Sequence, residues 1–165
     1  MLTIHGWTRL AHPLFLDQVE RLIAAVEALK AKRPHDYQKS SDAKLLATLL
    51  QLISKNIPSD PAAVIYRQGS TLGDARKHWF RAKFGNGRFR LFFRYSSTQK
   101  IIIFAWVNDA TSLSAYGAKT DAYHVFKSML DASNPPDDWG QLYEAAAAES
   151  AIGRFKKAKA EQPES

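Results

Sequence analysis

Cysteine is absent from this 165-residue sequence, which excludes disulfide bonds, thiolate nucleophiles and thiolate metal ligands. No stretch approaches the roughly 18 consecutive apolar residues that a membrane-spanning helix needs. The N-terminus also lacks a basic segment followed by an apolar stretch and a small-residue cleavage site. We therefore expect an unexported protein of the cytoplasm that does not associate with membranes.

Sequence patterns for nucleotide or metal binding are missing as well. The chain has no glycine-rich phosphate-binding motif and no serine-centred hydrolase turn. Its five histidines are scattered, and no pair shows the spacing and companion ligands of a zinc site. They are His5, His12, His35, His78 and His124. We expect no metal and no cofactor, and we assign His12, next to Pro13 at a helix start, a capping role.

What the chain does have is positive charge and enough apolar residues for one core. Its 23 Lys and Arg residues exceed its 16 Asp and Glu residues, giving a net charge of +7, and 45% of its residues are hydrophobic. This length and composition predict a single domain over residues 1–157 and a flexible tail over 158–165. The charge favours a polyanionic partner, which means nucleic acid, an anionic membrane or an acidic protein.

Two helices are predicted in the first third of the chain. Apolar residues recur at three- and four-residue spacing from Pro13 to Lys32, which predicts an amphipathic helix. A second apolar face begins after a cap at Ser41-Asp42 and continues to Ile57, where Pro58 should end the helix. Residues 56–74 contain several prolines and glycines and are predicted to form loops, with at most one short strand around Val64–Tyr66.

The pattern then changes to the two-residue period of strands. Three consecutive antiparallel strands are predicted at Trp79–Phe84, Arg88–Tyr95 and Lys100–Val107, and the last, being almost wholly apolar, should be central. A short helix from Ala122 to Leu130 and a last helix from Asp138 toward Lys157 follow. The fold class is α+β, with N-terminal helices packed on a small antiparallel sheet, followed by C-terminal helices.

Basic residues concentrate in the first predicted hairpin, between residues 76 and 94, where no acidic residue occurs. Because side chains alternate along a strand, each strand has a basic side and an apolar side. The basic residues of this stretch are Arg76, Lys77, Arg81, Lys83, Arg88, Arg90 and Arg94. A two-residue loop at Gly85-Asn86 would place Lys83 opposite Arg88 and Arg81 opposite Arg90, with the basic sides on one face.

A basic strand face has two readings. It can be an ordinary solvated surface, or it can bind phosphates, which are the natural counter-charge for cations that repel each other across a strand pair. Arginine forks onto phosphate, and aromatic rings near the strands, at Trp79 and Phe92, could stack on bases. These features favour nucleic acid, although they do not by themselves indicate catalysis.

The order of residues in this region resembles the YhaV toxins, a branch of the RelE-like ribonuclease superfamily of type II toxin–antitoxin systems. The hairpin sequence RAKFGNGRFRLFFRYS, residues 81–96, carries most of the resemblance. The likeness extends over roughly residues 5–143. Further matching motifs are Gly6-Trp7, Ala11-His12-Pro13, Trp106-Val107-Asn108-Asp109, Tyr116-Gly117, Lys119-Thr120-Asp121-Ala122-Tyr123 and Pro135-Pro136 before Asp138-Trp139.

The resemblance implies a RelE-like fold whose open sheet face binds mRNA, with cleavage that is often tied to the ribosome and that inhibits translation and growth. It also implies a cognate antitoxin, in this branch a PrlF-type protein related to AbrB-like DNA-binding proteins. RelE-like enzymes place two basic residues in one strand, an arginine in the next, another basic residue after the last strand and a tyrosine near the C-terminal helix.

Residues of this chain match most of that pattern. Arg81 and Lys83 match the first pair, Arg90 the next-strand arginine and Tyr116 the tyrosine. The basic residue expected before the tyrosine is missing, since residues 108–111 read Asn-Asp-Ala-Thr. The candidate catalytic residues are Lys83, Arg90, Tyr116 and Arg81, and the candidate substrate-binding residues are Arg88, Arg94, Trp79, Lys119, Asn108 and Asp109.

The proposed chemistry is metal-independent cleavage in which the ribose 2′-hydroxyl attacks the adjacent phosphate. Arg90 would stabilise the phosphorane, and Lys83 or Tyr116 would transfer protons. Because the expected basic residue is absent, a non-catalytic RNA- or DNA-binding module stays open as an alternative. A third reading, an adaptor for acidic proteins, predicts no affinity for nucleic acid.

Overall fold

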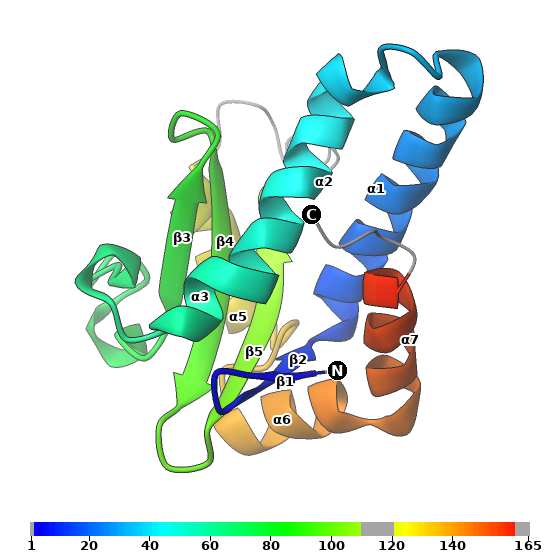
Figure 1. The fold of residues 1–165 in the computed structure, drawn as a ribbon. Coiled ribbons are helices and arrows are strands. Elements are labelled where there is room, and N and C mark those ends of the chain that lie inside the picture. Colours follow the sequence, from blue (N-terminus) through cyan, green and yellow to red (C-terminus); the bar gives the residue numbers. More distant parts are fainter. Residues whose placement is uncertain (1, 110–120, 161–165) are drawn as a thin grey trace.

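A five-stranded mixed sheet forms the centre of the molecule in the computed structural model, which describes residues 2–109 and 121–160 (Figure 1). The strands lie in the order β1-β2-β5-β4-β3. Their bounds are β1 Thr3–Ile4, β2 Trp7–Ala11, β3 Phe80–Phe84, β4 Phe89–Ser96 and β5 Ile101–Val107. The three strands predicted from the hairpin region are therefore present, and the apolar β5 is central, as predicted.

The N-terminal segment adds two strands that the sequence did not predict. β2 pairs with β5 in parallel, with Thr8 opposite Ile101, while the other strand pairs are antiparallel. The expectation of a purely antiparallel sheet is thus wrong. The two-residue pattern is obscured in β2 because Arg9, only 2% exposed, stands in the core and donates hydrogen bonds to the carbonyls of Leu2 and Ile53.

Helices cover both faces of the sheet. Three short 3₁₀ turns, at Tyr37–Lys39, Val64–Tyr66 and Asp74–Arg76, interrupt the loops. The other helical elements are α1 Pro13–Lys32, α2 Ser41–Gln51, a π-helical turn Leu52–Asn56, α3 Ile57–Ser59, α5 Ala122–Asp131, α6 Trp139–Ala147 and α7 Glu149–Ala160. The α+β class is confirmed, with the helices arranged in two layers around the sheet.

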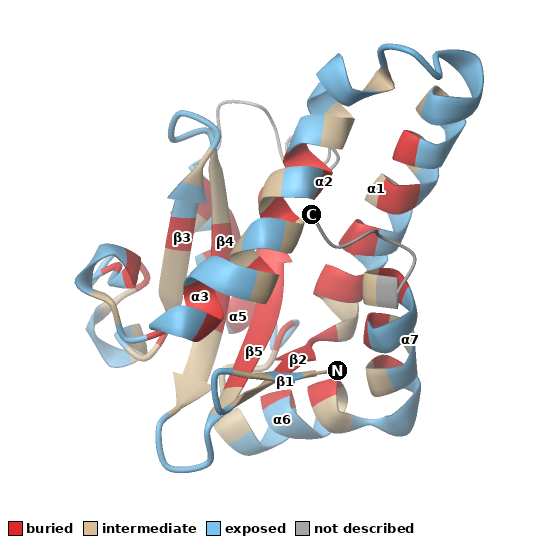
Figure 2. Cartoon of the chain, in the orientation of Figure 1, coloured by how far each residue is buried: buried red, intermediate tan, exposed pale blue. Residues whose placement is uncertain are grey.

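Each layer encloses a separate apolar core, and β5 is buried on both sides (Figure 2). Helices α1, α2 and α7 pack on the face that carries Ala82, Leu91 and Phe93. Helices α5 and α6 pack on the opposite face, around Phe92 and Trp106. The strand face that carries the basic residues is therefore the one that α5 approaches.

The predicted α1 begins and ends at the observed residues. His12 is its N-cap, and the His12 Nδ1 accepts a hydrogen bond from the Leu14 amide at 3.1 Å, so the capping role is confirmed. Deeper in α1, the buried side chain of Gln18 bonds both the amide and the carbonyl of Val107, at 3.1 and 2.6 Å. This pair of hydrogen bonds fixes the end of β5 against α1.

Other helix ends differ from the predictions by a few residues. Ser40 caps α2 in place of Ser41-Asp42, and the helical run that begins there continues through the π-helical turn and α3 to Ser59, one residue beyond Pro58. Asp138 caps α6 as predicted, but an extended Ala148 separates α6 from α7. Residues 158–160, predicted to belong to a flexible tail, are part of α7, and Ala158 is buried.

The hairpin register differs from the predicted one by two residues. Phe84 pairs with Phe89 and Lys83 with Arg90, so the turn contains four residues, 85–88. The backbone at Gly85, Asn86 and Gly87 has positive φ, which permits this longer turn. The rings of Phe84 and Phe89 stack at 5.3 Å across its base. Because a shift of two residues preserves the faces, the basic side chains still share one side.

Candidate active site

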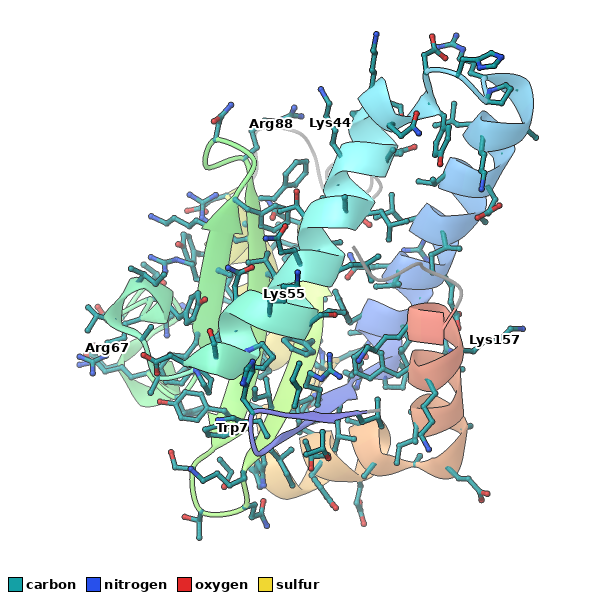
Figure 3. All side chains as sticks on the ribbon, in the orientation of Figure 1. Trp7, Lys44, Lys55, Arg67, Arg88 and Lys157 are labelled. Carbon is teal, nitrogen blue, oxygen red and sulfur yellow. The ribbon has the colours of Figure 1, made fainter. Side chains whose placement is uncertain are left out.

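Arg81, Lys83 and Arg90 come together on one face of the β3–β4 hairpin, with Lys83 and Arg90 next to its turn. Lys83 lies directly opposite Arg90 in the ladder, so their side chains leave the same face of the sheet. Arg81 and Arg90 are half-buried, whereas Lys83 is exposed. Arg88 is exposed at the hairpin tip (Figure 3), where it can meet a ligand that approaches this end. The structure therefore places four of the predicted site residues in one region.

The face that carries these residues is not open along its whole length. Phe126 of α5 stacks on Phe92 of β4 with ring centroids 4.3 Å apart, and Trp106 stacks on Phe126 at 5.7 Å. Phe92 and Phe126 are fully buried by this contact. The expectation of an open sheet face is thus wrong for this region, because α5 covers its middle. The basic residues lie around the covered patch.

Tyr123, in the first turn of α5, lies between the two arginines. Its hydroxyl accepts a hydrogen bond from the Nε of Arg81 at 2.8 Å, and the Arg90 guanidinium lies over its ring, 5.2 Å from the centroid. Asp121 positions this turn by accepting a hydrogen bond from the Tyr123 amide at 3.0 Å. The helix thus brings a phenol hydroxyl into the basic cluster.

The two arginines change the acidity of the Tyr123 phenol. Burial alone would raise the pKa of Tyr123, but the hydrogen bond from Arg81 and the charges of Arg81 and Arg90 outweigh burial and lower this pKa below its ordinary value. A phenol with a lowered pKa gives up its proton more readily, and cations beside it stabilise the resulting phenolate. Tyr123 can therefore transfer protons at this site.

Tyr123 was missed as a functional residue by the sequence prediction. The tyrosine expected from the resemblance was assigned to Tyr116, which lies outside the described residues, as does Lys119. The sequence does place Tyr123 after Asp121, a helix N-cap type, in one of the motifs that carry the resemblance. A tyrosine one residue inside a helix that follows a basic hairpin was the pattern that could have identified it.

The backbone around Arg90 is held by Asn108. Its side chain accepts a hydrogen bond from the Arg90 amide at 2.6 Å and donates one to the Arg88 carbonyl at 3.0 Å. Asn108 is 5% exposed and follows Val107, which Gln18 clamps. Asn108 therefore positions Arg90 and is too buried to bind RNA as predicted. The same burial, 9% exposure, argues against RNA contact by Asp109.

Trp79 and Arg94 also differ from their predicted roles in substrate binding. Trp79 is fully buried and its indole nitrogen donates a hydrogen bond to Asp137 at 2.7 Å, so it offers no face to a base. Arg94 is sandwiched between the Trp79 and Trp139 rings, at 5.7 and 5.2 Å, and donates a hydrogen bond to the Asp137 carbonyl at 2.6 Å. Burial lowers the pKa of Arg94, partly opposed by Asp137 and Asp138. These residues tie the C-terminal segment to the sheet.

The described residues contain no metal-binding cluster and no membrane-spanning helix. Over residues 2–109 and 121–160, no three His, Asp or Glu side chains are grouped so that they could hold a metal ion. Among the helices of these same residues, none is long and apolar enough to cross a membrane.

Comparisons with known proteins agree with the geometry. The family model for a "toxin with endonuclease activity, of toxin-antitoxin system", named for YhaV, matches residues 9–147. The chain is 47% identical over 140 residues to Toxin YhaV of Escherichia coli O6:H1 strain CFT073. It is 46% identical over 140 residues to Ribonuclease toxin YhaV of Escherichia coli strain K12. Both alignments cover 84% of this chain and 91% of the relative.

No solved structure is significantly similar to the chain. The family match nevertheless spans the basic hairpin and α5, which are the elements that build the Arg81, Arg90 and Tyr123 cluster. On the evidence of this match and of both relatives, the chain belongs to the YhaV family, the endonuclease toxins of toxin–antitoxin systems.

Proposed function

We propose that this toxin cleaves mRNA at the cluster of Arg81, Lys83, Arg90 and Tyr123, without a metal ion, and so inhibits translation in the cytoplasm. The observation that carries the proposal is the position of Tyr123, whose hydroxyl accepts a hydrogen bond from Arg81 at 2.8 Å and whose ring lies beneath the Arg90 guanidinium. A proton-transfer group beside two cations is what phosphodiester cleavage requires.

RNA supplies its own nucleophile in this mechanism. A base removes the proton from the ribose 2′-hydroxyl, and the oxygen attacks the adjacent phosphorus. The bond from phosphorus to the 5′ oxygen then breaks, and an acid protonates this leaving oxygen. The products are a 2′,3′-cyclic phosphate and a 5′-hydroxyl. The chemistry needs no metal, because arginines can stabilise the charge that develops on the phosphorane.

Roles follow from the position of each side chain. Arg90 and Arg81 flank the Tyr123 hydroxyl, so a phosphate placed beside that hydroxyl meets both guanidinium groups. Tyr123 transfers one proton. Lys83, exposed on the same face and opposite Arg90, transfers the other. Arg88 at the hairpin tip binds an adjoining phosphate of the RNA. Tyr116 and Lys119 stay predictions from the family resemblance.

Deoxyribose substitution tests the chemistry. Replacing the ribose on the 5′ side of the cut by deoxyribose should stop cleavage while hardly weakening binding, because the phosphates and bases are unchanged. EDTA should leave the rate unchanged. Cleavage of the deoxy-substituted strand at the normal rate, or loss of activity in EDTA, would mean that water is the nucleophile and that the roles given above are wrong.

Substitutions test the residues. Tyr123→Phe and Lys83→Ala should each lower the cleavage rate by on the order of 10², the usual loss when a proton-transfer group is removed. Tyr143→Phe is the matched control, because Tyr143 is an exposed tyrosine of α6, and this variant should cleave RNA at the normal rate. A normal rate for Tyr123→Phe, with Tyr116→Phe inactive, would return the assignment to Tyr116.

Binding without cleavage is the alternative function. A non-catalytic RNA- or DNA-binding module would retard RNA in a gel and leave its length unchanged, whereas the proposed enzyme shortens it. In either case the logarithm of the affinity should fall with the logarithm of salt concentration, by about 0.7 per phosphate contacted on a single strand. An adaptor for acidic proteins would bind no RNA.

The toxin class implies an antitoxin, and the resemblance predicts that it is of the PrlF type. Expression of the toxin alone should arrest growth, and Arg90→Glu should abolish the arrest while the protein remains folded. Continued toxicity of a soluble Arg90→Glu variant would remove the hairpin from the mechanism.

A further inference from the structure

β3 is an edge strand whose outer side is largely unpaired within the described part of the chain. It is the last strand of the sheet, and an isolated bridge between Arg67 and Phe80 is the one pairing that the described residues make on its outer side. Figure 1 shows β3 at the margin of the sheet, and Figure 3 shows Arg67 on the loop beside that margin. An unpaired strand edge presents amides and carbonyls that a further strand can bind.

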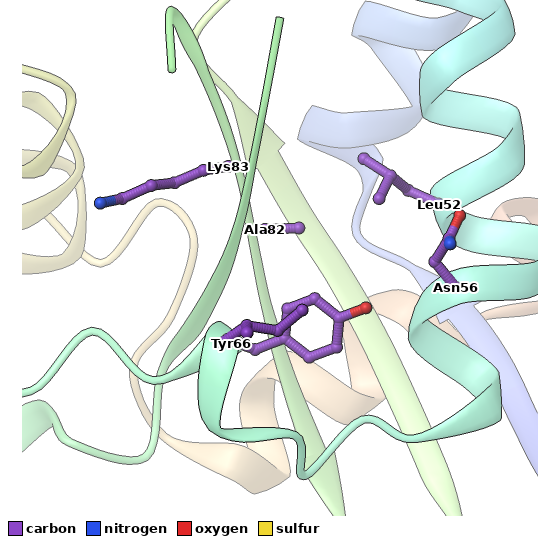
Figure 4. Close-up of a pocket in the computed structure, with 6 residues that line it drawn as sticks. Leu52, Asn56, Tyr66, Ala82 and Lys83 are labelled. Atoms are coloured by element: carbon purple, nitrogen blue, oxygen red, sulfur yellow. The ribbon is translucent and has the colours of Figure 1, made fainter. Parts of the chain in front are cut away.

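An apolar pocket adjoins this edge. It has a volume of about 350 Å³ and is lined by Leu52, Asn56, Ile65, Tyr66, Ala82 and Lys83 (Figure 4). Leu52 and Asn56 are the first and last residues of the π-helical turn, and the buried Arg9 supports this turn through its bond to the Ile53 carbonyl. The wall of the pocket opposite the strand is therefore held in place by the core.

Two neighbouring aliphatic side chains at this site are unusually exposed. Val64 and Ile65 are 71% and 73% exposed, and Ile65 lines the pocket. The Ile65 carbonyl also accepts a hydrogen bond from Arg81 Nη1 at 2.8 Å, which joins the pocket rim to the active site. Exposed aliphatic residues beside an unpaired strand and a pocket are typical of a surface that a protein partner covers.

The two sides of β3 differ in chemistry. In Figure 4, Ala82 points toward Leu52 across the pocket, whereas Lys83 leaves the strand on the opposite side. A segment that pairs with the edge of β3 would alternate in the same way. Its side chain next to Ala82 would enter the apolar pocket, and its next side chain would lie beside Lys83 and Arg81, where a carboxylate would be stabilised.

We propose that the outer edge of β3 is the docking site for an extended segment of the antitoxin in which apolar and acidic side chains alternate. The segment adds a strand to the sheet, fills the pocket beside Ile65 and places a carboxylate at Lys83. Charge complementarity favours an acidic segment, because the chain carries a net charge of +7.

This docking also explains how the antitoxin would inhibit the enzyme. A carboxylate at Lys83 and Arg81 occupies the position of the RNA phosphate, so binding and inhibition coincide. The inhibitory part of the inference rests on the proposed function, whereas the docking itself does not. The experiment below therefore measures complex formation without RNA, and a failure of the proposed chemistry would leave its result unaffected.

The test compares two exposed apolar positions. Ile65→Glu should weaken the complex of the full chain with its full-length cognate antitoxin by about tenfold or more, because a buried aliphatic contact is replaced by a charge. Tyr143→Glu introduces the same charge on α6 and should bind normally. Calorimetry measures both affinities. Equal affinities for Ile65→Glu and the unsubstituted chain would overturn the proposal.

Hydrogen exchange supplies a second measurement. Alternate amides of Phe80–Phe84 should become protected when antitoxin binds, because a new strand bonds every second residue of an edge. Protection that appears only elsewhere on the chain would overturn the proposal. It would also be overturned if Ile65→Glu lost affinity for RNA and kept its affinity for antitoxin, since the pocket would then belong to the RNA site.

Discussion

Burial of His12 couples the stability of this protein to pH. The side chain is 6% exposed at the junction of β2 and α1, where its Nδ1 accepts a hydrogen bond from the Leu14 amide. Burial lowers the pKa of His12 from 6.5 to about 4, against the opposing charge of Asp17. Protonation in the folded state is therefore costly, because it places a charge in the core and removes the acceptor that caps α1.

The direction of the pH effect follows from the two pKa values. Between pH 6.5 and pH 4 the unfolded chain binds a proton at His12 and the folded chain does not, so acid favours unfolding. From a shift of this size, the free energy of unfolding should fall by about 2 kcal/mol between pH 7 and pH 5, and by about 3 kcal/mol once the pH is below 4.

Urea denaturation at pH 7, 6 and 5 measures this dependence. His12→Asn is the informative variant, because asparagine also caps helices but carries no titratable group. In this variant the free energy of unfolding should fall much less between pH 7 and pH 5 than in the unsubstituted protein. The carboxylates whose pKa is lowered, Glu20 and Asp137, affect stability only at more acidic pH, so they do not mask the result. An equal decrease in the variant and the unsubstituted protein would refute the assignment to His12.

Three further substitutions test the packing around the site by urea denaturation. Gln18→Ala should lower the free energy of unfolding by about 2–3 kcal/mol, because it leaves the buried amide and carbonyl of Val107 without the Gln18 hydrogen bonds. A decrease of less than about 0.5 kcal/mol, which is usual for a surface substitution, would contradict the clamp. Arg154→Ala should cost less than about 1 kcal/mol, although Arg154 makes two ion pairs, because these are exposed and screened; a larger loss would show that they act as a network. Gly85→Ala should destabilise the hairpin by about 1–3 kcal/mol, since Gly85 has a φ of 60° and an added Cβ would lie 2.7 Å from the Phe89 ring; unchanged stability would mean that the turn rearranges.

Local patterns explain which parts of the fold could be predicted. The first helix was predicted with its observed ends, because Pro13 and a long apolar face mark it without reference to the rest of the chain. The central position of β5 followed from its composition. The parallel β2 was missed, because its partner is distant in sequence and Arg9 interrupts its apolar pattern. Val64–Tyr66, predicted as a possible strand, forms a 3₁₀ turn that leaves two aliphatic side chains exposed.

The grouping of the candidate site residues could be predicted where it follows from the alternation of side chains along a strand. It could not be predicted where it depends on the position of α5. Arg81, Lys83 and Arg90 share a face because strands alternate, and this held although the register differed by two residues. Alternation could not show that α5 covers part of the face. For this reason Trp79 and Arg94, assigned to RNA, pack in the interior, and Tyr123, which α5 brings to the arginines, was not singled out.

The parallel pairing of β2 with β5 has a consequence for synthesis on the ribosome. β2 is synthesised early, but its parallel partner β5 is synthesised only after the whole basic hairpin. Thr8, for example, pairs with Ile101, which lies far along the chain. Contacts between such distant segments form slowly, because a long loop must close first. β5 is synthesised after the other strands of the sheet, so β2 gains this partner only then. α5, which carries Tyr123, is synthesised later still. The candidate cluster of Arg81, Arg90 and Tyr123 therefore cannot assemble until the chain has been synthesised at least as far as α5.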